Sequence, residues 1–177
     1  LQMLIYLFAL RRFGADYYGK PVEPVGVLYI PARAAMERVD PGADERKIEA
    51  ARAANRRRSG LVIDDEALLH AMERQEQPEY LPCKWQKSGL TGDIASRIQF
   101  SELEHFVQDK IAGMTDEIFG GNVTPNPIVR GPQVSSCQFC DFYAACHRDL
   151  GQQEARPIRK VSAEKFWTQV DGGADHG

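Results

Sequence analysis

The sequence PVGVLYIP at residues 24–31 decides the fold class, because a β-branched and aromatic run carries a proline at each end. Such a run is typical of a short strand. It follows LQMLIYLFALRRF at residues 1–13, which is apolar at nearly every position and precedes Gly14, a residue that favours a helix end. The sequence therefore predicts a largely buried helix over 1–13, a core strand over 25–30 and an α/β fold.

The composition of the 177-residue chain narrows the function classes. Lys and Arg number 22 against 25 Asp and Glu, a net charge of −3, so any contact with nucleic acid must be local. The longest apolar run, residues 1–10, is well short of the roughly 20 residues that a bilayer crossing requires, and it lacks the flanks of a signal peptide. We expect no membrane association. Since the chain opens inside this run without an initiator Met, we also expect it to be part of a longer polypeptide.

The middle of the chain is predicted to be mainly helical. Residues 41–59 are rich in Ala, Glu and Arg, which predicts an exposed helix or a mobile connection. Within it, Arg56-Arg57-Arg58 could contact phosphate but more often forms a solvated face. A helix capped by Asp64 or Asp65 follows, and its apolar side is predicted to hold Ala67, Leu68, Ala71 and Met72.

Three further segments lead to the C-terminal region. Residues 75–92 contain prolines and glycines without periodicity, which predicts a loop. The pattern Ser101-Glu102-Leu103-Glu104 is typical of a capping box and predicts the start of a helix that continues to Gly120-Gly121. Pro125-Asn126-Pro127 then predicts an extended arm that leads into a cysteine cluster.

Three of the four cysteines lie within ten residues, at Cys137, Cys140 and Cys146. This C-x2-C-x5-C spacing allows a turn and the first coil of a helix to direct three thiolates at one centre. A disulfide scaffold would distribute more cysteines along a shorter chain. The cluster therefore predicts a metal site in a reducing compartment such as the cytoplasm.

The spacing leaves the fourth ligand open. His147 is adjacent to Cys146, so a local zinc site of three cysteines and one histidine would be strained. Cys83 could reach across from a proline-bounded loop about fifty residues away and complete a zinc site. Alternatively, the fourth thiolate lies outside this chain, and four thiolates shielded by aromatic neighbours suit an iron-sulfur cluster.

The first residues also carry a resemblance to a known family. Gln2-Met3-Leu4-Ile5-Tyr6 resembles the Q-x-x-x-Y motif of RecB-type nucleases of the PD-(D/E)XK superfamily, and residues 25–30 resemble their next core strand. Residues 60–66, the predicted Ser101 helix and the cysteine spacing follow in the order seen at the C-terminus of the AddB family, whose members form part of the helicase-nuclease AddAB. The resemblance runs from Leu1 to about Val170.

This resemblance implies the C-terminal portion of a restriction-endonuclease-like nuclease domain with a helical extension and a Cys-rich tail. The expected division is the end of the nuclease core over 1–40, a mainly helical extension over 41–132, an iron-sulfur-binding tail over 133–170 and a disordered end over 171–177.

The same resemblance implies roles for particular residues. Cys137, Cys140 and Cys146 would bind a 4Fe-4S cluster whose fourth ligand lies outside this chain. Gln2 and Tyr6 would be accessory catalytic residues that orient DNA phosphate or a catalytic lysine. The Asp and Glu/Asp-x-Lys residues that hold Mg²⁺ are expected before Leu1. Glu45-Arg46-Lys47 spells that motif but lies in a polar segment, so we interpret it as a coincidence.

The function implied is that of a DNA exonuclease subunit, with DNA and an AddA-like helicase-nuclease subunit as partners, in the repair of double-strand breaks. The chain alone is expected to be inactive. Two alternatives stay open: another RecB-type iron-sulfur nuclease, such as a Cas4-type enzyme, and a zinc-stabilised binding module without a catalytic role.

Overall fold

The computed structural model describes residues 1–33, 36, 40, 42–130, 134–146 and 156–171. The chain divides into two compact units, residues 1–107 and 108–177, which contain helices and short strands. The predicted α/β class is confirmed at this level. Among the described residues, no helix has both the length and the apolar character that a bilayer crossing needs. The predicted disordered end lies outside the described residues except for Asp171.

The N-terminal helix is longer than the sequence predicts. α1 spans Gln2–Tyr18 and ends at Gly19, whose φ of 69° is the left-handed conformation that glycine adopts at little cost. The predicted end at Gly14 is wrong, because Gly14 is buried inside the helix. A Cβ there would meet the Val22 side chain at 3.1 Å, so this glycine allows close packing and does not terminate the helix.

α1 is also less buried than predicted. Of its described side chains, Leu7 and Phe8 are buried, while Tyr6, Phe13 and Tyr17 are each more than half exposed. The apolar pattern predicted the helix correctly. Its burial was overestimated, because a helix buries only the surface that its neighbours cover.

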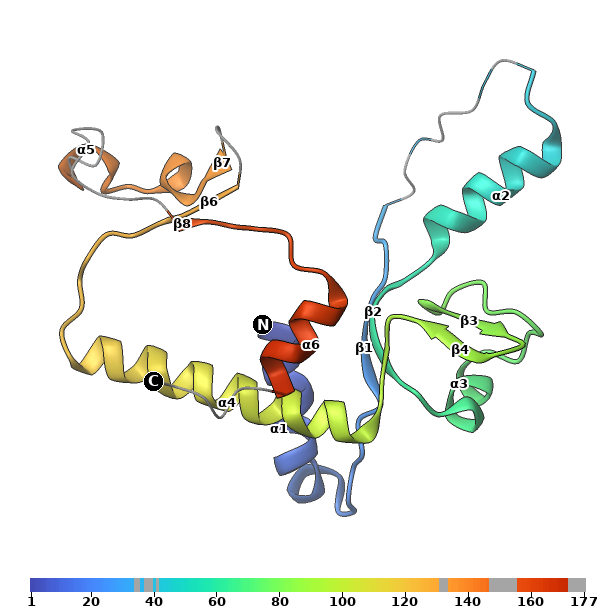
Figure 1. Ribbon diagram of the computed structural model, residues 1–177, viewed down its shortest axis with the longest axis horizontal. Helices are drawn as coiled ribbons and strands as arrows, with labels where there is room; N and C mark the ends of the chain where they lie inside the picture. The colour runs from blue at the N-terminus through green and yellow to red at the C-terminus, as the bar shows by residue number, and fades with distance from the viewer. Residues whose placement is uncertain (34–35, 37–39, 41, 131–133, 147–155, 172–177) are drawn as a thin grey trace. The chain divides into compact units, whose positions relative to one another are not determined.

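The described residues of the first unit form a three-stranded sheet (Figure 1). β1, Gly26–Tyr29, pairs antiparallel with β2, Ser59–Ile63, and β2 pairs parallel with β5, Ile94–Ala95. The predicted core strand over 25–30 is therefore confirmed as β1. β1 and β5 are the two edge strands of this sheet.

Two helices flank β2 in the sequence. α2, Glu45–Arg56, is capped by Asp44, whose carboxylate accepts a backbone hydrogen bond in the first turn. None of the described residues of α2 is buried. The prediction of an exposed helix is confirmed. α3, Glu66–Met72, begins at Asp65, one of the two predicted caps, whose carboxylate also accepts a backbone hydrogen bond.

Residues 75–92, predicted to be a loop, contain a β-hairpin. β3, Cys83–Gln86, pairs antiparallel with β4, Gly89–Gly92, across a two-residue turn. Gly89 and Gly92 have φ values of 116° and 127°, which favour glycine. The hairpin was missed because each strand has four residues and glycine, which usually weakens a strand, occupies half of β4.

The sheet buries apolar side chains on both faces. On one face, β2, α3 and the hairpin region share a cluster of fully buried residues: Val62, Leu69, Leu81 and Cys83. The predicted apolar face of α3 was wrong. Leu69, which is buried, was not among its predicted members, and Met72, which was, is 46% exposed. Ile63 follows Val62 on β2 and points to the opposite face, since side chains alternate along a strand.

α4, Arg97–Phe119, confirms the helix predicted at Ser101 but begins four residues earlier. The Gln99 backbone N–H donates to Ser96 Oγ at 3.2 Å, and the Ser96 N–H donates to Gln99 Oε1 at 2.9 Å. This capping box lies five residues before the predicted one. The helix ends before Gly120-Gly121 as predicted.

The second unit contains the clustered cysteines. β6, Ile128–Arg130, pairs antiparallel with β7, Val134–Ser135, and parallel with β8, Arg156–Pro157. The remaining described elements are the 3₁₀ turn η1, Ser136–Phe139, and the helices α5, Tyr143–Cys146, and α6, Ala163–Asp171. The predicted extended arm, Pro125-Asn126-Pro127, directly precedes β6.

Candidate functional site

The cysteine segment is a continuous series of turns. The Cys137 N–H donates to Ser135 Oγ at 3.1 Å, and the Cys140 N–H donates to the Cys137 carbonyl oxygen at 3.2 Å. The Cys146 N–H donates to the Phe142 carbonyl oxygen at 3.0 Å. These bonds order the backbone between β7 and α5. They place the first two cysteines on one turn and the third at the end of the following helix.

Cys137 and Cys140 line one open hollow together with Ser135, Gln138 and Tyr143. Thiolates on neighbouring positions of a tight turn are suitable ligands for zinc or iron. Cys146 is half-buried on α5 and is not among the residues that line the hollow. Within the described residues, no three His, Cys, Asp or Glu side chains form a group that could hold a metal ion. The structure thus brings two of the three predicted ligands to one hollow.

The aromatic neighbours do not shield the thiols as predicted. Phe139 is 90% exposed and Phe142 is 76% exposed, whereas Tyr143 lines the hollow. The two phenylalanines therefore offer apolar surface around the cysteines without covering them. His147, the predicted strained ligand, lies outside the described residues.

Cys83 is part of the apolar core of the first unit. It is 1% exposed in the cluster with Val62 and Leu69. Burial raises the pKa of the Cys83 thiol, which disfavours the thiolate that metals bind. Its position argues against a zinc site completed by Cys83.

Gln2 and Tyr6 lie one turn apart on α1 and contact each other. Gln2 Nε2 donates a hydrogen bond to the Tyr6 hydroxyl oxygen at 2.7 Å, and both side chains are exposed. Because the phenol oxygen accepts this bond, its own proton is available to a further acceptor, such as a phosphate oxygen. The structure brings the two predicted residues together, and their roles stay predictions.

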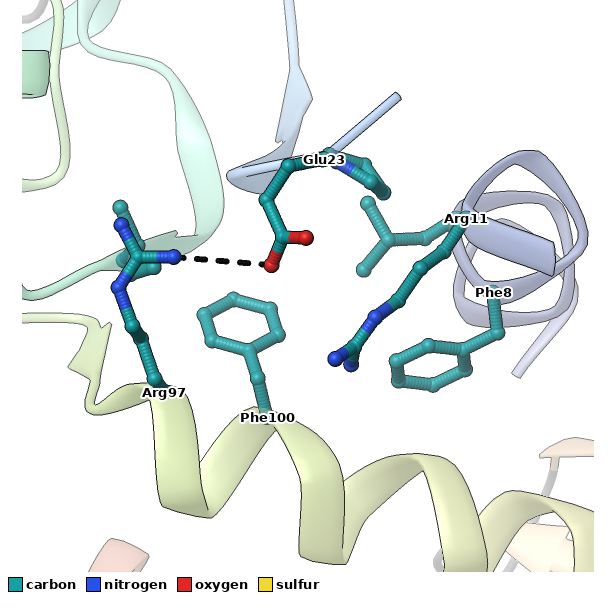
Figure 2. A pocket seen from close by; sticks show the side chains of 8 residues that line it. Phe8, Arg11, Glu23, Arg97 and Phe100 are labelled. Atoms are coloured by element: carbon teal, nitrogen blue, oxygen red, sulfur yellow. Dashed lines mark ion pairs between the residues drawn. The ribbon is translucent and has the colours of Figure 1, made fainter. Parts of the chain in front are cut away.

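A cavity in the first unit lies against the next turns of α1 (Figure 2). Its apolar wall includes Phe8 and Phe100, and Arg11, Glu23 and Arg97 also line it. Figure 2 shows Arg97 and Glu23 pointing toward each other, with Arg97 Nη1 3.6 Å from Glu23 Oε1.

The arginines of this cavity have acidic partners. Arg11 Nη1 lies 3.1 Å from Glu104 Oε2, and Arg97 Nη2 lies 3.3 Å from Asp65 Oδ2. The charges are balanced by these carboxylates, so the cavity provides ion pairs that join α1, α3 and α4. Sequence reasoning missed them, because the partners are 93 and 32 residues apart and no local pattern links them.

Two basic motifs lie on or beside α2. Glu45-Arg46-Lys47 forms the first turn of a helix, so it cannot present the carboxylate and lysine from a strand, which agrees with the interpretation as a coincidence. Each of the three arginines at 56–58 contacts the segment 78–83. Arg56 forms an ion pair with Glu79, and Arg58 lies over the ring of Tyr80. Arg57 donates hydrogen bonds to the carbonyl oxygens of Pro78 and Cys83. The run therefore attaches the end of α2 to the segment before the hairpin.

Comparison with known proteins identifies similar chains. No family model matches. The chain is 30% identical over 159 residues to the B subunit of an ATP-dependent helicase/deoxyribonuclease of Acetivibrio thermocellus, a match that covers 87% of this chain and 14% of the relative. Proteins of the same name from Listeria welshimeri and Symbiobacterium thermophilum are each 26% identical, over 97% and 100% of this chain and 16% of each relative. The chain therefore spans about one seventh of the length of these relatives.

Proposed function

We propose that this chain, which belongs to the AddB family of ATP-dependent helicase/deoxyribonuclease subunits, is the C-terminal part of such a protein and completes its nuclease domain. The observation that supports this proposal is the similarity over 87–100% of the chain to relatives that share this name. The parent polypeptide would hydrolyse DNA phosphodiesters with Mg²⁺, together with an AddA-like helicase-nuclease subunit, while double-strand breaks are processed for repair.

The proposed nuclease fold is the PD-(D/E)XK fold. The order of α1 and β1, with the Gln2–Tyr6 pair in the first turns of α1, supports it. Catalytic carboxylates and a lysine from another part of the polypeptide would bind Mg²⁺ and stabilise the charge that develops on phosphate. The Tyr6 hydroxyl would donate to a phosphate oxygen and orient it.

The proposed cofactor is a 4Fe-4S cluster bound by Cys137, Cys140 and Cys146, with a fourth thiolate from outside this chain. Two of these three thiols, those of Cys137 and Cys140, share one hollow, and sulfur donors are the ligands that such a group takes, which supports the proposal. When bound, the cluster would link distant segments of the polypeptide through iron–thiolate bonds. Zinc in the same thiolates is the alternative, and it would indicate a binding module.

The cofactor proposal is tested on the complete natural polypeptide, purified without oxygen. We expect iron and acid-labile sulfide in nearly equal amounts, with loss of both in a Cys140→Ser variant. A Cys83→Ser variant is the matched control and should retain them, because Cys83 is a core residue. Stoichiometric zinc without sulfide would contradict the cluster and support the zinc module.

The nuclease proposal is tested by degradation of single-stranded DNA in Mg²⁺. In the complete polypeptide with its partner subunit, Tyr6→Phe should slow cleavage by about tenfold or more, because a positioning donor is lost. Tyr17→Phe is the control, since Tyr17 is an exposed tyrosine of the same helix outside the motif. The 177-residue chain alone should not cleave DNA. Cleavage by this chain that a Glu45→Gln or Lys47→Ala substitution abolishes would overturn the proposed site.

A further inference from the structure

We propose that β8 is a latch that holds the cysteine segment in place, and that Arg156 is its positioning residue. The part of this inference that concerns metal affinity rests on the proposed metal-binding role of the cysteines. The latch itself rests on how β6, β7 and β8 pair in the second unit.

β6 is the shared strand of this small sheet (Figure 1). Ser135 of β7 pairs with Val129 on one side, two residues before the first clustered cysteine. Arg156 of β8 pairs with Ile128 on the other side, ten residues after the last one. Both ends of the cysteine segment are therefore attached to the same three-residue strand.

Arg156 makes more of these attachments than a strand residue needs. Its backbone N–H donates to the Pro127 carbonyl oxygen at 3.1 Å, and its Nε donates to the Asn126 carbonyl oxygen at 3.0 Å. The Ile158 N–H adds a bond to the Val129 carbonyl oxygen at 2.9 Å. One arginine thus binds two successive carbonyls of the arm before β6, through its main chain and its side chain.

The arm that Arg156 binds is stiff. In Pro125-Asn126-Pro127, two prolines fix their own φ angles, and each also restricts the residue before it. The Asn126 and Pro127 carbonyls are therefore oriented before the latch closes. This gives the Pro-Asn-Pro arm a structural role that its sequence alone does not reveal.

Closing the segment onto β6 reduces the conformations open to the cysteines. A segment fixed at both ends loses less entropy when its ligands gather around a metal than one fixed at a single end. Cys137 and Cys140 already lie on a turn that follows β7 directly. The latch would thus raise the affinity of the thiolates for a metal without contacting it.

The test uses the complete natural polypeptide, which supplies the proposed fourth thiolate, and two readouts. Hydrogen exchange of residues 134–146 is measured first without metal, and Co²⁺ binding by the reduced thiolates is then followed by absorbance. Arg156→Ala removes the side-chain bond, and Arg156→Pro also removes the main-chain donor. Arg159→Ala is the matched control, because it removes the same charge three residues further on, from an exposed position.

We expect the rate of hydrogen exchange over residues 134–146 to rise about fivefold in Arg156→Ala and further in Arg156→Pro. The rate in Arg159→Ala should equal that of the unsubstituted polypeptide. Co²⁺ affinity should fall in the same order. If exchange is the same in all four proteins, the latch is refuted whether or not metal binds. If exchange rises as expected but the unsubstituted polypeptide binds no Co²⁺, the latch stands and the metal proposal fails. Binding of Co²⁺ with equal affinity by Arg156→Pro and the unsubstituted polypeptide would refute the positioning role.

Discussion

Removal of the Glu73 carboxylate should destabilise the first unit more than removal of other surface glutamates. Glu73 Oε1 accepts the backbone N–H groups of Glu79, at 2.6 Å, and Tyr80, at 3.2 Å. Its Oε2 accepts those of Tyr80, at 3.2 Å, and Leu81, at 3.1 Å. One carboxylate therefore binds three successive amides of the segment that leads into β3, and Leu81 of that segment belongs to the buried core.

The size of the effect follows from these bonds. A hydrogen bond to a charged acceptor contributes about 1.5–3 kcal/mol, and a buried donor left without a partner costs about 1–3 kcal/mol. Glu73 is half-buried, so water can reach part of the site once the side chain is gone. We therefore expect Glu73→Ala to lower the free energy of unfolding by about 3 kcal/mol, less than the sum of three full bonds.

The measurement is urea unfolding followed by the fluorescence of Trp85, in a Trp167→Phe background so that one tryptophan reports. Trp85 packs against the core cluster that includes Leu81, so its signal follows this region. Glu76→Ala, at an exposed position three residues away, is the control and should change stability by less than about 0.5 kcal/mol. The reasoning fails if the Glu73 and Glu76 variants lose the same stability.

Three further predictions test the fold. Gly60→Ala should lower the free energy of unfolding by more than about 3 kcal/mol or prevent folding, because Gly60 has a φ of 145° and a Cβ would overlap the Val27 carbonyl oxygen. Gly113 lies in open space on α4, so Gly113→Ala should raise the free energy of unfolding by up to about 1 kcal/mol in the same urea assay. Because the pKa of the Cys83 thiol is raised in the folded state, its contribution to stability is fully present below the usual thiol pKa of about 8.5 and falls as pH rises above it. The loss of stability between about pH 8 and pH 10 should therefore be smaller in Cys83→Ala, and equal slopes would contradict this account. Tyr6→Phe should leave the unfolding free energy of the chain within about 0.5 kcal/mol, as judged by circular dichroism, since Tyr6 is exposed.

The features that sequence predicted well are those decided by neighbouring residues. The strand at 25–30 carries its own β-branched residues and proline borders, and Asp65 caps α3 with its own carboxylate. The helix predicted to begin at Ser101 is present as α4, although it begins at Arg97 and Ser96 and Gln99 form the capping box in place of the later pattern. Where two similar capping patterns lie within five residues, local chemistry alone does not decide between them.

The features that sequence missed depend on residues far apart in the chain. Gly14 looked like a helix end because nothing near it in sequence shows that Val22 packs against it. Cys83 was one alternative for the fourth metal ligand because its thiol is the same group as those at 137 and 140, and only the packing of Val62 and Leu69 around it reveals a core residue. Arg156 carries no motif at all, yet it binds carbonyls 29 and 30 residues earlier. The chemical type of a side chain therefore predicts which reactions it could support, whereas its tertiary partners decide whether it serves the site, the core or the latch.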